Sequence, residues 1–284
     1  MGILLAEAKA GVCEITPSGA ASLPVPLPWP SAPCAGAAAL AVGCQQTRAC
    51  VCLSRRGYEP ISRMPAVPGL SELCLSPCSR YLYQLSAEAD CVHTRAVATG
   101  DLLYATQTGV FPRMMRLSSD GRRLLVAGGA EARAYVLSAP DLRYEAVLDT
   151  RHPCFGADFW AGGLALVCAK EGEDIQTAVY TLSPGRARPR LVLELDGQPG
   201  GFCVCPNGTQ ALLSFRGGLI LLDLRTGAPL WNRPEWALCM RLCCQGAQAL
   251  ASETLDGRAY LFAIDRPWES RAFGLGVGAQ ACFT

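Results

Sequence analysis

The chain offers few residues that could act as a nucleophile with a base beside it. It has only two histidines among 284 residues, and nucleophilic catalysis needs a base within hydrogen-bonding distance of the nucleophile. His152 lies in the segment DTRHPCF, two residues before Cys154. Pro153 bends the chain between them, and no third partner is visible. No catalytic residue is therefore assigned.

Sixteen cysteines are a larger chemical set. Structural zinc sites usually take four Cys or His ligands from closely spaced pairs. The candidate pairs are Cys50/Cys52, Cys74/Cys78 and Cys203/Cys205. Most cysteines, however, stand inside apolar runs such as ACVCL, LALVC and RLCC, where free Cys behaves as a small buried hydrophobe. We expect reduced packing residues, no metal site and no cofactor.

The composition argues against several classes of partner. Half of the residues are hydrophobic, 17% are charged, and the net charge is +1. No block of like charge argues for binding to nucleic acid or to an anionic membrane. The longest basic run, RARPR from Arg186 to Arg190, adjoins a Pro-Gly turn and is expected to be a solvated hairpin tip.

The chain also lacks the patterns that direct a protein to a membrane or out of the cell. No window offers about 18 uncharged apolar residues, the length that a spanning helix needs. The N-terminal stretch MGILLAEAKAG has no basic n-region, and Glu7 and Lys9 break its apolar run, so no signal peptide is expected. The sequence predicts a cytoplasmic protein.

The elements that would position functional residues are short strands. Apolar segments of about four to eight residues, rich in Val, Leu, Ala and Tyr, are separated by Gly, Pro, Ser and Asp. Helical periodicity is nearly absent. This pattern indicates an all-β protein with many short strands.

A repeated corner organises these strands. LSSDGRRLL, with Gly121 at the corner, has counterparts in LSPCSRYLY, FWAGGLALV, VCPNGTQALL, LCCQGAQAL and a weaker copy, CAGAAALAV. Asp-Gly and Asn-Gly favour tight hairpins at such corners. The copies recur about every 38 to 46 residues, which is the period of propeller blades.

A second marker, the turn between the last two strands of each unit, occurs seven times and is clearest in LILLDLRTGAPLW. The first marker occurs six times and the second seven times. The two counts agree on seven units if the N-terminal unit contributes only three strands and the C-terminal tail GVGAQACFT supplies the fourth, innermost strand of that blade. The sequence thus predicts a single domain, 1–284, that is a seven-bladed β-propeller closed by both chain ends. A two-domain all-β protein remains the alternative. The expected blades are 1–31 with 275–284, 32–67, 68–110, 111–149, 150–195, 196–235 and 236–274.

Two segments also carry a family resemblance. LDLRTGAPLW resembles the strand–turn–strand signature of quinoprotein-like and YVTN-type propellers, and LSSDGRRLLVAG resembles the inner hairpin of the same YVTN/WD40-like superfamily. No blade has the Trp-Asp ending or the Gly-His start of WD40 repeats. The resemblance implies a propeller fold. It implies no activity, because such propellers serve as scaffolds, lactonases, dehydrogenases and assembly factors.

Aligning the units gives one polar feature of the inner strands. Arg116, Asp158 and Arg241 fall at equivalent positions, beside Cys74 and Cys203. Charged side chains cannot be buried cheaply between blades, so we expect them to face the central channel and to pair. Two interpretations stay open: a hydrated structural network, and a binding site for an anionic ligand or partner around the two arginines.

The loops that lead into the inner strands supply a second set of candidate binding residues: Arg113, Arg151, His152, Arg233, Trp236 and Trp29. Arg and Trp are common anchors of protein interfaces, and loops on a rigid scaffold often carry binding residues.

The sequence therefore predicts a non-enzymatic scaffold, a monomeric ring that binds a protein or peptide on one rim. The alternative is a lactonase-like hydrolase at the channel mouth that uses a divalent metal with Glu72 or Asp158. A purely structural module of a larger assembly is a third possibility.

Overall fold

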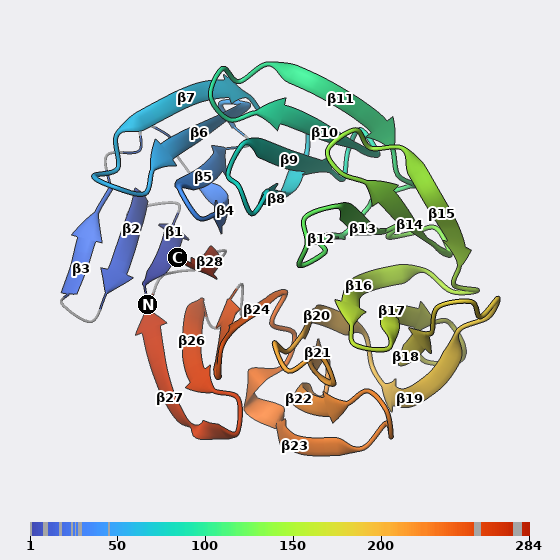
Figure 1. The fold of residues 1–284 in the computed structure, drawn as a ribbon. Helices are drawn as coiled ribbons and strands as arrows, with labels where there is room; N and C mark the ends of the chain where they lie inside the picture. Colours follow the sequence, from blue (N-terminus) through green and yellow to red (C-terminus); the bar gives the residue numbers. More distant parts are fainter. Residues whose placement is uncertain are drawn as a thin grey trace.

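Seven small sheets surround a common axis (Figure 1). The computed structural model describes residues 2–7, 11–16, 19–23, 25, 27, 30–44, 46–252, 257–274 and 280–284. Within these residues the strands form seven four-stranded antiparallel sheets. The all-β, seven-bladed propeller expected from the sequence is confirmed.

The blades are numbered from the N-terminus, and the strands of each blade are given from the axis outward. Blade 1 holds β28 (Gln280–Phe283), β1 (Ile3–Glu7), β2 (Gly11–Thr16) and β3 (Gly19–Ser22); blade 2 holds β4 (Ser31–Ala35), β5 (Ala39–Cys44), β6 (Ala49–Ser54) and β7 (Pro60–Pro65); blade 3 holds β8 (Leu70–Leu75), β9 (Tyr81–Ser86), β10 (Cys91–Ala96) and β11 (Leu102–Gln107); blade 4 holds β12 (Met114–Leu117), β13 (Arg123–Ala127), β14 (Arg133–Ser138) and β15 (Tyr144–Asp149). Blade 5 holds β16 (Cys154–Trp160), β17 (Gly163–Lys170), β18 (Gln176–Leu182) and β19 (Arg190–Asp196); blade 6 holds β20 (Pro199–Val204), β21 (Gln210–Phe215), β22 (Gly218–Asp223) and β23 (Pro229–Arg233); blade 7 holds β24 (Arg241–Gln245), β25 (Gln248–Ser252), β26 (Arg258–Ala263) and β27 (Arg266–Gly274). A short 3₁₀ turn, η1 (Pro234–Trp236), precedes β24.

The corner between the first two strands of a blade is built by the residues that repeat in the sequence. In blade 4 the carboxylate of Asp120 accepts a backbone N–H two residues further on at 3.1 Å. In blade 6 the amide oxygen of Asn207 accepts the corresponding N–H, also at 3.1 Å. Gly121 and Gly208 follow them with φ of +69° and +70°, a conformation that glycine adopts without steric cost. The Asp-Gly and Asn-Gly pairs in the sequence therefore determine the conformation of these hairpin turns.

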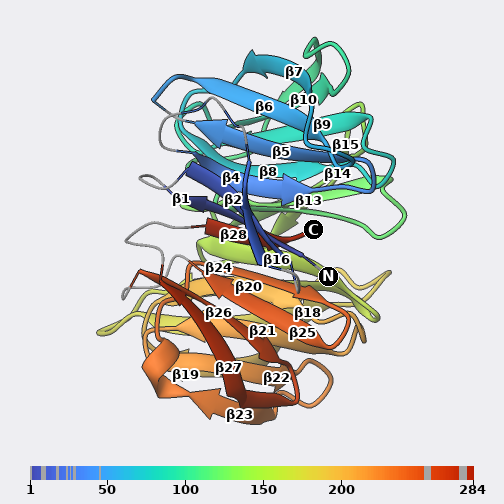
Figure 2. The same cartoon turned by 90° about the vertical axis from the view of Figure 1, so that its left-hand side faces the viewer.

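The two chain ends close the ring. Strand β28 pairs with β1, with Cys282 opposite Leu4, and the N–H of Thr284 donates to the carbonyl of Gly2 at 2.9 Å. The hydroxyl of Thr284 donates to Glu14 Oε1 at 2.8 Å in a buried contact. The N- and C-terminal ends accordingly lie side by side in both views (Figures 1 and 2).

Burial decreases from the inner half of each blade to its outer strand. All six side chains of β5 are buried, whereas five of the six in β11 are exposed. The sixteen cysteines all lie in the described ranges and are all free, and ten are buried, as their apolar sequence context predicted. Across these ranges, no helix has the length and apolar character to span a bilayer.

Two glycines with the same backbone angle test how closely the segment that enters blade 4 packs on the turn between β13 and β14. Gly129 has φ of +60° and Gly246 has φ of +59°. A Cβ on Gly129 would lie 1.7 Å from the carbonyl oxygen of Phe111, whereas one on Gly246 would meet nothing within 4 Å. We expect Gly246→Ala to lower the free energy of unfolding by about 1–2 kcal/mol and Gly129→Ala to lower it by at least about 3 kcal/mol. Denaturant unfolding measures both values, and equal losses would contradict the close approach.

Candidate functional site

One position of the seven inner strands forms a ring of polar and sulfur side chains. It is the third pair of each blade when the hydrogen-bonded pair that closes the first corner is counted as the first. In blade 4 these pairs are Ser118 with Arg123, Leu117 with Leu124, and Arg116 with Leu125. From blade 1 to blade 7 the residues are Cys282, Cys34, Cys74, Arg116, Asp158, Cys203 and Cys243. We call these seven residues the channel ring. Five of the seven blades therefore present a cysteine.

Arg241 does not belong to the channel ring, in contrast to its predicted alignment. It lies opposite Ser252, two residues before Cys243. Glu72 and Gln280 lie at this same level in their own blades, opposite Leu85 and Ala6. A shift of two residues keeps every side chain on its own face of the strand. The hydrophobic pattern is therefore the same whether Arg241 or Cys243 is aligned with Arg116, and it could not distinguish the two alignments.

Four charged side chains form a network across these two levels. Arg116 Nη1 lies 2.7 Å from Glu72 Oε1, and Arg116 Nε lies 3.9 Å from Asp158 Oδ2. Arg241 Nη2 lies 3.5 Å from the same Glu72 oxygen. The four side chains are between 11% and 20% exposed. Two cations and two carboxylates give a network without net charge, which we call the central network.

The central network also ties neighbouring inner strands together. Glu72 accepts the N–H of Met115 in the next blade. Asp158 Oδ2 accepts the N–H of Val204 at 2.8 Å, again in the next blade. Arg116 Nη2 donates to the carbonyl of Phe202 at 3.3 Å. These contacts favour the structural interpretation of the charges, because both arginines already face carboxylates and neither is left for an anionic ligand.

Burial controls protonation in the channel ring. It raises the pKa of Asp158, an effect that the charge of Arg116 partly offsets. Burial also raises the pKa of Cys74 and of Cys243 to about 12. Both thiols are therefore protonated at neutral pH, and a protonated thiol is neither the nucleophile nor the ligand form of cysteine.

The channel mouth on the side of the first corners is a cavity of about 530 Å³, lined by the central network and by most of the channel ring. A lactonase-type cation would need free carboxylate oxygens there. Glu72 and Asp158, the carboxylates expected for it, both face Arg116. Among the residues that the structure describes, no three His, Cys, Asp or Glu side chains are placed to hold a metal ion. The donor set does not fit a divalent cation.

The loops that lead into the inner strands lie around the opposite mouth of the channel. Arg113 lines a smaller cavity there, of about 310 Å³, with its guanidinium 5.1 Å from the ring centre of Phe155. Arg151 is exposed after β15, and His152 is half-buried. The carbonyl of His152 accepts the Thr150 hydroxyl at 2.8 Å.

Trp236 is not the exposed rim anchor that the sequence suggested. It is 4% exposed and stacks on Tyr260 with a centroid distance of 4.9 Å. Arg233 lies over its ring at 4.5 Å and donates to the carbonyl of Pro267 at 2.8 Å. The large apolar area of the indole is buried where blades 6 and 7 meet, and Arg233 packs with it. Trp29, the remaining rim candidate, lies outside the described residues.

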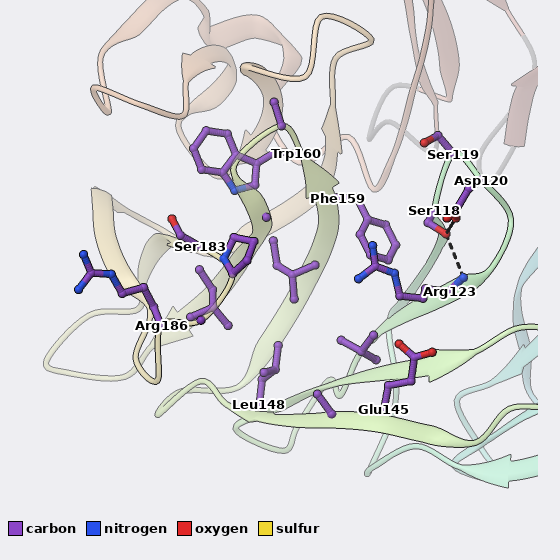
Figure 3. Close-up of a pocket in the computed structure, with 18 residues that line it drawn as sticks. Ser118, Ser119, Asp120, Arg123, Glu145, Leu148, Phe159, Trp160, Ser183 and Arg186 are labelled. Atoms are coloured by element: carbon purple, nitrogen blue, oxygen red, sulfur yellow. Dashed lines mark hydrogen bonds between the residues drawn. The ribbon is translucent and has the colours of Figure 1, made fainter.

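A larger hollow lies on the face of the first corners, between blades 4 and 5 (Figure 3). It has a volume of about 590 Å³ and is lined by the corner of blade 4, by β15, and by the first corner and last turn of blade 5. We call it the 4/5 groove. Phe159, Trp160 and Leu164 supply apolar surface, while Arg123 and Arg186 bring positive charge to its edges. The two arginines are exposed, and the run that begins at Arg186 forms the solvated hairpin tip that was expected.

The indole of Trp160 distinguishes this groove from a related one. Its Nε1 is buried with no hydrogen-bond partner among the described residues. Between blades 6 and 7 an equivalent hollow of about 550 Å³, the 6/7 groove, holds Trp231. There the indole N–H donates to the carbonyl of Ile264 at 2.8 Å. The two indoles stand on different walls of their grooves, Trp160 at the end of the inner strand β16 and Trp231 on the outer strand β23, and of the two it is Trp160 whose N–H has no partner among the described residues.

The 4/5 groove was not predicted from the sequence, because its walls come from segments up to about 70 residues apart that only blade packing brings together. One local signal was present. The aromatic pair Phe159–Trp160 stands directly before the corner glycines of blade 5, where a strand end reaches the surface.

No protein-family model and no curated protein matches this sequence, whereas many solved structures share its fold. Hydrazine synthase from Kuenenia stuttgartiensis aligns with a TM-score of 0.69 and 13% identity over 87% of this chain and 80% of that one. A protein from Lactobacillus plantarum aligns with a TM-score of 0.75 and 12% identity over the full length of both chains. Dihydro-heme d1 dehydrogenase NirN, solved in complex with DHE, aligns with a TM-score of 0.58 and 16% identity over 96% of this chain and 53% of its own. At these identities the likeness establishes the propeller fold alone.

Removing Arg116 should make stability depend on pH. Arg116→Met leaves Asp158 without a cation, while Glu72 keeps Arg241 at 3.5 Å, and breaking a buried pair costs about 3 kcal/mol. We expect this loss at pH 7.5 and a smaller one at pH 5. Burial already raises the pKa of Asp158, and the pKa rises further without the guanidinium of Arg116. A buried carboxyl is less costly when it is protonated, so the variant is more stable at low pH and loses this stability as the pH rises through the raised pKa.

Denaturant unfolding at the two pH values measures this difference. Arg143→Met is the matched control, because Arg143 pairs with Asp141 at 2.9 Å but is 84% exposed, and exposed pairs contribute little. The same loss for Arg116→Met at both pH values would contradict a buried, charge-balanced network.

Thiol labelling should separate one cysteine from the other fifteen. Cys78 is the exposed one, and its pKa is lowered by a contact from the Ser76 hydroxyl, 3.4 Å from its sulfur. We expect one equivalent of a maleimide to react rapidly with the native protein at pH 7, because the thiolate is the reactive form. Intact-mass spectrometry reads the stoichiometry. Cys78→Ser should abolish the fast phase, and a fast phase that persists in this variant would show that a buried cysteine is accessible.

Proposed function

We propose that this propeller is a non-enzymatic scaffold that binds an extended peptide segment of a protein partner in the 4/5 groove. The observation that carries the proposal is the combination of an aromatic floor and charged edges in one open hollow on a rigid ring. A volume of about 590 Å³ lies within the range of about 300–1,000 Å³ that ligand sites occupy. The proposal keeps the class of function expected from the sequence but moves it to the face of the first corners.

The lining residues indicate the chemistry of the partner. Phe159 and Trp160 offer two separate aromatic surfaces, with Phe159 beside Arg123 and Trp160 beside Ser183 (Figure 3), and aromatic side chains of this kind anchor interfaces. Arg123 lies over the ring of Phe159 at 5.6 Å, which orients its guanidinium along the groove. Arg186 has no ion pair among the described contacts and is exposed. A peptide with an apolar residue next to an acidic residue would fit this arrangement. If the Trp160 side chain rotates toward the peptide, its indole N–H could donate to a peptide carbonyl.

Two further features support binding rather than catalysis. Among the described residues that line it, the groove contains no histidine or cysteine, and its one hydroxyl–carboxylate pair belongs to the blade 4 corner: Ser118 donates to Asp120 at 2.6 Å and accepts the N–H of Arg123 at 2.9 Å. The channel mouth holds carboxylates, but they are paired with arginine. The free, mostly buried cysteines support a reducing, cytoplasmic setting for such a scaffold.

A displayed library of random 12-residue peptides, selected on the purified protein, tests the proposal. We expect enriched peptides to share an apolar residue next to an acidic one, and synthetic copies to bind with affinities measurable by calorimetry. Ala146 lies on the groove wall formed by β15. Ala146→Arg should weaken binding at least about tenfold, equivalent to about 1.4 kcal/mol, because the new side chain fills the hollow.

Leu230→Lys is the control, since Leu230 lines the 6/7 groove on the corresponding outer strand. Its peptide affinity should stay within about twofold of the original protein. A selection without a shared motif, or peptides that bind the folded Ala146→Arg variant with unchanged affinity, would overturn the assignment of the 4/5 groove.

A further inference from the structure

The outermost strand of each blade presents an unpaired edge, and the seven edges differ in how they are protected. Exposed edges recruit other strands unless proline, charge or shortness prevents it. Five outer strands carry prolines or charges: Pro60, Arg63 and Pro65 in β7; Glu145 and Asp149 in β15; Arg190, Glu194 and Asp196 in β19; Pro229 and Arg233 in β23; Arg266, Pro267, Glu269 and Arg271 in β27. β3 is only four residues long and consists of small residues. β11, with the sequence LLYATQ, has none of these protections.

β11 is also the most apolar of the exposed edges. Leu102, Leu103 and Tyr104 are consecutive and are 48%, 41% and 44% exposed. Consecutive strand residues point to opposite faces, so apolar side chains flank the free edge on both sides. β11 stands at the end of the sheet order β11-β10-β9-β8, with hydrogen bonds on one side only.

The neighbouring blade extends this apolar wall. Tyr144 and Val147 of β15 are 50% and 51% exposed, and the Tyr144 hydroxyl donates to the carbonyl of Gln107 at the end of β11. Figure 1 shows β11 and β15 following one another along the outer wall of the ring. Five large apolar side chains therefore surround one unprotected strand edge.

We propose that β11 pairs in antiparallel fashion with β11 of a second copy of this chain, joining two rings edge to edge across a two-fold axis. β11 itself is uncharged, so an identical strand meets no like charge. The two-fold axis brings Asp101, which precedes β11, to the Gln107 end of the other copy. There Arg133, which shares a shallow cleft with Gln107, is 59% exposed. Within its own chain Arg133 makes a long ion pair with Glu131, at 3.9 Å, so Asp101 of each copy would face an exposed cation that it shares with Glu131 of the other copy.

The size of the wall sets the strength of this dimer. Five side chains that are about half exposed provide about 400 Å² per copy. The strand backbone brings the total close to the lower limit of about 1,000 Å² for a specific interface. An interface close to this lower limit is expected to be weak and reversible. The proposed monomer–dimer equilibrium differs from the monomeric ring predicted from the sequence.

Sedimentation velocity of the full chain from about 1 to 300 μM tests the proposal. We expect the weight-average sedimentation coefficient to rise with concentration from the monomer to the dimer value. Leu102→Lys should weaken the association at least tenfold, because lysine on a free edge blocks strand pairing. Leu230→Lys is the matched control, because Leu230 is also 48% exposed and lies on the outer strand of blade 6. This variant should dimerise as the original protein does. Circular dichroism verifies that both variants fold.

Hydrogen exchange adds a second readout. In the original protein the amides of β11 should exchange more slowly at 300 μM than at 1 μM, and in Leu102→Lys they should not. A monomer at every concentration, or equal dimerisation of Leu102→Lys and the original protein, would overturn the proposal. The result is independent of peptide binding, because Ala146→Arg alters the 4/5 groove and should dimerise normally.

Discussion

The pairing of β28 with β1 is the contact on which the rest of the structure depends. Each blade is a four-stranded sheet too small to bury its own apolar faces, and it is stable only when it packs between two others. An open row of seven blades would leave two such faces exposed at its ends. The ladder from Gly2 to Ala6 against Gln280 to Thr284 removes both faces. It also fixes the ring at seven blades, which sets the distances between the inner strands around the axis.

Those distances explain the central network. Inner strands converge on the axis, so charged residues at their ends are brought within reach of one another. Glu72 of blade 3, Arg116 of blade 4 and Asp158 of blade 5 meet because the ring is closed at that radius. Buried ion pairs contribute little net stability over apolar packing, but they penalise any other arrangement of the blades, since a shift would leave a charge unpaired. The same pairing places a carboxylate beside each of the two arginines.

The sequence was sufficient for the architecture because each blade repeats a local signal. Asp120–Gly121 and Asn207–Gly208 specify the same turn by the same hydrogen bond, wherever they stand in the chain. The sites were harder to predict because they depend on contacts between blades. Arg241 was placed two residues out of register, since a two-residue shift leaves the burial pattern intact. Trp236 was expected at the surface from its loop position, but a 3₁₀ turn directs it into the core between blades 6 and 7.

Strand β15 links the two surfaces to which functions are assigned. Glu145, Ala146 and Leu148 line the 4/5 groove, while Tyr144 and Val147 line the cleft that borders β11. This division follows from the alternation of side chains along a strand, with an irregularity between Val136 and Leu137 in the pairing of β14 that accommodates Tyr144. Because the side chains of β15 divide between the two faces, the proposed peptide groove and the proposed dimer edge use different side chains of the same strand. If both proposals hold, two joined rings would carry two such grooves related by the same two-fold axis.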